Sequence, residues 1–96
     1  MKKILIIITI VLMSSFTFSQ ERVISGKVTD ENNVTLPGVS IIVKGANRGT
    51  SSDMDGEYTI RLKNDDAVLV FSYLGYKTVE SQTKGKGVIN VQMKED

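Results

Sequence analysis

The chain has 96 residues, a formal net charge of +1, and 12 Lys+Arg against 11 Asp+Glu, so it holds one small domain at most and has no basic excess for binding a nucleic acid. Histidine and cysteine are absent, which excludes imidazole catalysis, thiolate chemistry, disulfides and ordinary zinc sites. An apolar core of this size rarely supplies more than about 3–5 kcal/mol, so we expect a partner or a covalent neighbour.

The first residues have the layout of a secretory signal peptide. A pair of lysines precedes the ten residues of the apolar stretch Ile4–Met13, and Thr17 and Ser19 occupy the small-residue positions before a cut at Gln20. A cut one residue later is the alternative. An uncleaved anchor is disfavoured because a spanning helix needs about 20 apolar residues. We therefore predict a signal peptide over residues 1–19 and one exported domain over residues 20–96, with no membrane span after cleavage.

In the first half of the domain, apolar residues recur at every second position, which is typical of pleated strands. Ile24, Gly26 and Val28 share one face of the first predicted strand. Polar and Pro-Gly turns separate that strand from the next. The predicted strands here are residues 23–29, residues 39–44 and a short irregular strand around Thr50.

The second half continues the same pattern. Residues 57–62 alternate without error, and residues 67–74 are almost continuously apolar, which predicts a strand in the middle of a sandwich. Gly75 interrupts that run, residues 76–82 resume as a strand, and a last strand alternates through residues 89–93. Six or seven short strands without a helix after the leader predict an antiparallel β-sandwich or a Greek-key barrel.

The stretch 51–60 contains the start of a calcium-binding pattern. Asp53, Asp55 and Gly56 match the third, fifth and sixth positions of an EF-hand loop, but Ser51 and Leu62 occupy the first and twelfth positions, where ligands are needed. A strand rather than a helix follows. Aspartate caps tight turns and glycine adopts positive φ, so we predict a turn, with a weak cation site at Asp53 and Asp55 as the alternative.

Other chemistry-bearing residues indicate no catalytic, cofactor-binding or metal site. The adjacent acids Asp65 and Asp66 lie in an open turn, where neighbouring carboxylates are solvated, whereas general acid catalysis needs a desolvated one. The aromatic residues of Phe71–Tyr76 are predicted to be core rather than a stacking platform for sugars or peptides. Arg48 is a solvated side chain on a glycine-rich loop. A free sheet edge remains as a surface for strand addition, and the sequence does not show which edge is free.

The order of motifs resembles the carboxypeptidase regulatory-like domain, in the form found at the N-terminus of SusC-like TonB-dependent outer-membrane transporters of Bacteroidota. The resemblance covers residues 23–93. The matching pieces, in chain order, are Gly26-Lys27-Val28-Thr29-Asp30, Leu36-Pro37-Gly38-Val39, Lys44-Gly45, Gly49-Thr50, Asp53 with Asp55-Gly56, and Gly75-Tyr76.

The resemblance implies a seven-stranded, transthyretin-like Greek-key β-sandwich. It also implies an accessory module without catalytic residues or cofactors, located in the periplasm or at the periplasmic face of the outer membrane. In the transporters such a domain precedes a TonB box, a plug and a barrel that imports glycans or peptides. This chain stops at Asp96, so the resemblance implies a stand-alone module or a truncated transporter rather than a whole transporter.

We therefore expect a non-catalytic periplasmic interaction domain associated with a TonB-dependent nutrient uptake system, with a protein partner in the outer-membrane transport machinery. The alternative is a free-standing β-sandwich module that binds a carbohydrate or a peptide.

Overall fold

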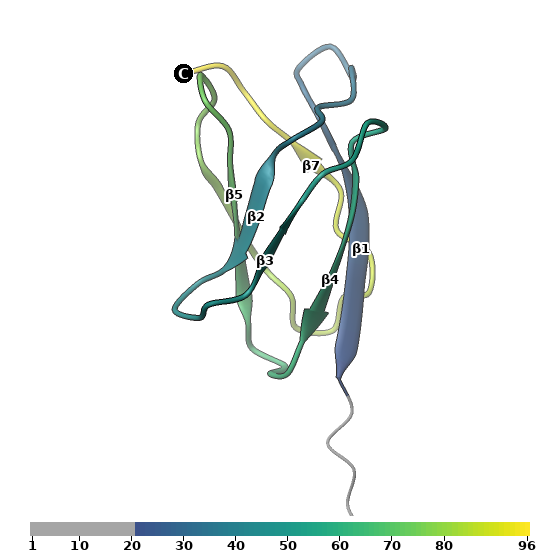
Figure 1. Ribbon diagram of the computed structural model, residues 1–96, viewed down its shortest axis with the longest axis vertical. Helices are drawn as coiled ribbons and strands as arrows, with labels where there is room; N and C mark the ends of the chain where they lie inside the picture. Colours follow the sequence, from purple (N-terminus) through teal and green to yellow (C-terminus); the bar gives the residue numbers. More distant parts are fainter. Residues whose placement is uncertain (1–20) are drawn as a thin grey trace, which may run out of the picture.

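The computed structural model describes residues 21–96, which form two β-sheets and no helix (Figure 1). The predicted signal peptide, residues 1–19, lies outside the described residues. Within the described range no helix is long and apolar enough to cross a membrane. The strands are β1 (Arg22–Thr29), β2 (Ser40–Val43), β3 (Gly49–Ser51), β4 (Glu57–Leu62), β5 (Val68–Ser72), β6 (Val79–Gln82) and β7 (Val91–Gln92).

The smaller sheet has the strand order β4-β1-β7, and the larger sheet has the order β3-β2-β5-β6. Neighbouring strands are antiparallel except for β7, which pairs parallel with β1 at Val28 and Thr29. The two-sheet, all-β prediction is confirmed, and the prediction of a wholly antiparallel sandwich is wrong at β7. The physical reason is that β6 ends near the start of β1, as the hydrogen bond from Arg22 to the Thr83 carbonyl shows. The chain therefore returns beside β1 in the same direction.

The core lies between the two sheets and follows the predicted alternation. In β4, Tyr58, Ile60 and Leu62 are buried while the residues between them are exposed. The rings of Tyr58 from the smaller sheet and Phe71 from the larger sheet meet edge to face, with centroids 5.4 Å apart. This geometry is the favoured contact between aromatic rings. The buried apolar residues are Ile24, Val28, Leu36, Val39, Ile41, Tyr58, Ile60, Leu62, Leu69, Phe71, Ile89, Val91 and Met93.

The segment after β6 reaches the core by passing close to Gly26 of β1. A Cβ atom at Gly26 would overlap the carbonyl group of Ile89. The Tyr58 hydroxyl donates a hydrogen bond of 2.6 Å to that same carbonyl oxygen, and the Ile89 N–H donates one of 2.9 Å to the Ser25 carbonyl. We call this arrangement the Gly26–Ile89 contact. It fixes the last segment of the chain against β1.

Four predicted strands are shorter than expected. The strand predicted over residues 39–44 is Ser40–Val43, and the strand predicted over residues 67–74 is Val68–Ser72. The strand predicted over residues 76–82 begins at Val79, and the last strand is reduced to Val91–Gln92. Before β6, the end of the chain pairs with the loop between β5 and β6: the Lys77 N–H donates to the Lys94 carbonyl at 2.8 Å, and the Asp96 N–H donates to the Gly75 carbonyl at 3.0 Å. Before β7, the Asn90 side chain, and not a backbone carbonyl, accepts the Lys27 N–H at 3.0 Å. These bonds replace ladder pairing at both places.

Gly26→Ala is expected to destabilise the protein by about 2 kcal/mol or more, since the added methyl group forces the Ile89 carbonyl away from β1. Gly87→Ala is the matched control, because its Cβ atom meets no heavy atom within 4 Å, and we expect a change within about 0.5 kcal/mol. Urea unfolding measures both values. Equal stability of the two variants would contradict the Gly26–Ile89 contact.

The stability contribution of Tyr58 is expected to depend on alkaline pH. Burial raises the pKa of Tyr58 to about 12, above the ordinary tyrosine value of about 10. The folded protein therefore keeps the phenol proton that the unfolded chain loses, so the Tyr58 contribution is complete below about pH 10 and falls as the pH rises toward 12.

Tyr58→Phe removes this titration together with the hydrogen bond to Ile89. The difference in unfolding free energy between wild type and Tyr58→Phe should narrow between about pH 9 and pH 12, as followed by urea unfolding at each pH. A difference that stays constant over that range would show that the hydroxyl is not buried as described.

Candidate functional site

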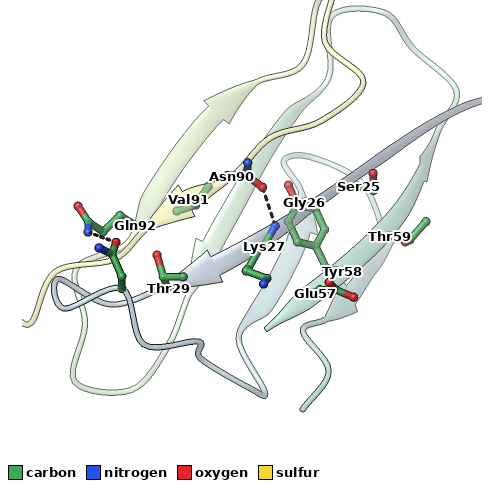
Figure 2. A pocket seen from close by; sticks show the side chains of 11 residues that line it. Ser25, Gly26, Lys27, Thr29, Glu57, Tyr58, Thr59, Asn90, Val91 and Gln92 are labelled. Carbon is green, nitrogen blue, oxygen red and sulfur yellow. Dashed lines mark hydrogen bonds between the residues drawn. The ribbon is translucent and has the colours of Figure 1, made fainter. Parts of the chain in front are cut away.

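An open groove of about 830 Å³ lies on the outer face of the smaller sheet (Figure 2). The alternation of β1 and β4 turns the apolar residues to the core and the polar residues to this face. The groove is lined by Ser25, Gly26, Lys27, Thr29, Asn33, Glu57, Tyr58, Thr59, Asn90, Val91 and Gln92.

Amide side chains hold the groove in shape. The Asn90 Oδ1 atom accepts a hydrogen bond of 3.0 Å from the Lys27 N–H and so bridges the gap between β1 and the segment before β7. Gln92 donates a hydrogen bond of 3.3 Å to the Asn33 side chain at one end of the groove. Figure 2 shows both bonds, with the side chain of Thr29 on β1 near them and that of Thr59 farther away on β4. The surface can therefore exchange hydrogen bonds with a polar ligand.

The described residues that line the groove include few groups suited to proton transfer or to stacking on sugar rings. Lys27 and Glu57 are both exposed, and general acid–base catalysis depends on groups whose proton affinity burial or close charges have altered. The ring of Tyr58 is only 3% exposed because it points into the core. No aromatic face is thus presented by the described lining residues. Hydrogen bonding is the chemistry that this groove supports.

The Asp53 loop is a turn, as predicted. The Asp53 carboxylate accepts hydrogen bonds of 2.9 Å from the N–H groups of both Asp55 and Glu57, and the Gly56 N–H donates to the Asp53 carbonyl. Gly56 has φ of 75°, and a Cβ atom there would lie 2.7 Å from the Val28 carbonyl oxygen. Among the described residues no group of three or more carboxylates, histidines or cysteines is placed to hold a metal ion.

The other candidates from the sequence do not come together into a site. Asp65 forms an ion pair with Arg22 rather than a contact with Asp66. The Arg48 guanidinium donates a hydrogen bond of 3.0 Å to the Arg61 carbonyl. The Arg48 side chain therefore lies along the edge of β4, where its guanidinium binds a backbone carbonyl and not a carboxylate.

The aromatic residues are largely core, as predicted. Phe71 is fully buried, while Tyr73 and Tyr76 are half-buried against the core and stack on one another with centroids 5.6 Å apart. Between them lies Leu74, which is 97% exposed. The aromatic stretch thus ends in an ordered turn and does not form an open platform.

Sequence reasoning missed two features. The polar groove depends on Asn90 and Asn33, whose role follows from the pairing of distant segments and has no local signal. Arg22 was also missed: besides Asp65 it binds the carbonyl groups of Thr83 and Lys86. Every residue has a backbone carbonyl, so the sequence does not show which carbonyls Arg22 will bind. The opposite charges of Arg22 and Asp65 were the one sequence signal for this contact.

Asp53→Ala is expected to destabilise the protein by about 1 kcal/mol, because the N–H groups of Asp55 and Glu57 lose their shared acceptor. Asp55→Ala is the matched control and should be nearly neutral. Thermal unfolding with and without millimolar calcium tests the metal alternative, since a specific ligand raises the melting temperature by mass action. A calcium-dependent rise that both substitutions abolish would contradict the turn assignment.

Comparison with solved structures shows the fold. One chain of a type II cohesin–X-dockerin complex from Acetivibrio cellulolyticus superposes with a TM-score of 0.62 at 14% identity, over 75% of this chain and 56% of that chain. A 3-chlorocatechol 1,2-dioxygenase from Rhodococcus opacus superposes with a TM-score of 0.61 at 11% identity, over 85% of this chain and 62% of that chain. At such low identity these likenesses concern the β-sandwich alone.

Sequence comparison shows the family. The TonB-dependent receptor P3 of Formosa agariphila is 41% identical over 88 residues, which is 91% of this chain and 9% of the receptor. The TonB-dependent receptor SusC of Bacteroides thetaiotaomicron is 30% identical over 95 residues, which is 99% of this chain and 9% of that receptor. The chain thus spans about a tenth of the length of these relatives. The profile of the CarboxypepD_reg-like domain matches residues 24–96, and the chain belongs to this family.

Proposed function

We propose that the chain is a non-catalytic accessory domain that makes protein contacts within a TonB-dependent outer-membrane nutrient uptake system. The observation that carries this proposal is the similarity of 91–99% of the chain to one segment of such receptors, at 30–41% identity. The resemblance of residues 1–19 to a signal peptide supports export, and the proposed location is the periplasm or the periplasmic face of the outer membrane. The strand order supports a transthyretin-like Greek-key form of the sandwich over residues 20–96.

The chemistry of the described residues agrees with binding rather than catalysis. Of the ionisable side chains that line the groove, Lys27 and Glu57 are exposed, and the buried Tyr58 donates its hydroxyl to the Ile89 carbonyl. The Asp53 carboxylate accepts backbone amides, and Asp65 pairs with Arg22. Catalytic acids and bases are usually found where burial or close charges shift their proton affinity. The proposed role therefore rests on surfaces and edges of the sandwich.

A second candidate function is a free-standing module that binds a glycan or a peptide. The groove on the outer face of the smaller sheet favours it, because its hydroxyl and amide groups suit a polar ligand. Aromatic rings that would stack on a sugar are not exposed among its lining residues, as the burial of Tyr58 shows.

Domain replacement in a related receptor tests the first proposal. Residues 20–96 would replace the similar segment of the SusC receptor of Bacteroides thetaiotaomicron, and uptake of that receptor's substrate would be compared with uptake by the receptor lacking the segment. We expect the chimera to restore at least half of the uptake lost on deletion. The same chimera with Gly26→Ala is the control, because a destabilised domain should restore less.

Two results would contradict the proposal. A chimera that transports no better than the deletion would show that the domain does not function within the uptake system. Normal transport by the deletion itself would show that this segment contributes nothing to uptake. Glycan binding by the isolated protein, together with a chimera that fails, would favour the second candidate.

A further inference from the structure

We propose that the outer edge of β6 is a docking site for an extended segment of a partner protein, which adds to the larger sheet as an antiparallel strand. The inference rests on the proposed function, because it names the surface through which the accessory domain makes its contact. Strand addition uses main-chain hydrogen bonds for affinity and alternate side chains for specificity.

One side of the sandwich is closed to such an addition. The edge strands are β4 and β7 in the smaller sheet and β3 and β6 in the larger sheet. β3 and β4 lie against each other at the side where residues 52–56 join them. The outward carbonyl of Glu57 accepts the Asp53 N–H at 2.8 Å, and the outward carbonyl of Arg61 accepts the Arg48 guanidinium. These bonds engage the outward carbonyls at the two ends of β4, and β3 lies beside the rest of this edge.

The backbone of β6 is free on its outer side. In an antiparallel ladder, hydrogen-bonded pairs alternate with non-hydrogen-bonded pairs. The Thr83 N–H donates to the Ala67 carbonyl at 3.1 Å, so the next hydrogen-bonded pairs along the β5–β6 ladder are those of Ser81 and Val79. The backbone groups of the intervening residues, Glu80 and Gln82, therefore point away from β5. Within residues 21–96 their N–H groups meet no acceptor, and the Gln82 carbonyl has only a 3.4 Å contact from the Ser81 hydroxyl.

A groove of about 410 Å³ lies beside this free edge, between β6 and residues 86–92. β6 and β7 bound it without pairing with each other. Val79, Ile89 and Val91 line it, and Val88 is 64% exposed. Ile89 and Val91 are only 7% exposed, so Val88 is the apolar side chain that stands open beside the unpaired backbone, with the charged Glu80 and Lys86 near it. The groove therefore offers main-chain partners and one accessible apolar side chain.

The geometry defines the chemistry of the partner. β6 spans four residues, so the bound segment is a short strand of similar length. Side chains that fall toward Val88 should be small or branched apolar residues. The side chains between them should be polar because they lie beside Glu80 and Lys86 at the surface. The partner is thus an extended peptide with alternating apolar and polar residues.

A display library of random linear nonapeptides is the probe. Peptides selected on the wild-type protein should show this alternation, and on binding they should shift the amide NMR signals of Glu80, Gln82 and residues 86–92. Glu80→Pro removes an outward N–H while leaving the β5 ladder intact, and we expect at least tenfold weaker binding. Glu80→Ala, which keeps the N–H, and Thr59→Pro, on the closed side, should bind as the wild type does.

The peptide supplies a test that does not depend on the folding of a variant. Methylation of alternate amide nitrogens in a selected peptide should abolish binding in one register and leave it within twofold in the other. Equal binding to wild type and to a folded Glu80→Pro protein would overturn the proposal. Three other results would overturn it as well. The peptides could shift the NMR signals of the outer face of β4 and β1, or the selection could yield no binder. A second copy of the chain could also prove to be the only occupant of the edge. None of these results depends on whether the receptor chimera transports.

Discussion

The close contact between the Ile89 carbonyl and Gly26 ties the C-terminal segment of the chain to β1. The smaller sheet has only three strands, and its third strand pairs with β1 through two residues. A parallel ladder of two residues is too short to fix β7 beside β1 without further contacts. The missing side chain at Gly26 lets the Ile89 carbonyl approach the Tyr58 hydroxyl, and the same segment carries Ile89, Val91 and Met93 into the core. A chain without disulfides thereby fixes its C-terminal segment.

This constraint also decides how the two sides of the sandwich differ. On one side the turn over residues 52–56 joins β3 and β4 and covers their backbone. On the other side the last segment is drawn toward β1, so it leaves a groove beside β6. The burial that stabilises the fold thus leaves one edge of the larger sheet open. A domain with one open edge suits a role in protein contacts, which is the role proposed for it within an uptake system.

Much of the fold could be predicted from the sequence because its signals are local. The period-two alternation of β4 gave its inward and outward residues correctly, and the Asp53–Gly56 turn has the hydrogen bonds and the positive φ that its residue types favour. The parallel pairing of β7 and the contraction of β6 could not be predicted, since both follow from contacts between distant segments. The polar groove was missed for the same reason: Asn90 acquires its role only from the position of Lys27.

Hydrogen–deuterium exchange of individual amides, followed by NMR under native conditions, measures how firmly the Gly26–Ile89 contact fixes the last segment and whether the outer edge of β6 is open. The amides of Ile89 and Ser25, both hydrogen-bonded across that contact, should exchange at the rate set by global unfolding. The amides of Glu80 and Gln82 should exchange nearly as fast as those of exposed loops. Strong protection of Glu80 and Gln82, or rapid exchange at Ile89, would contradict the account.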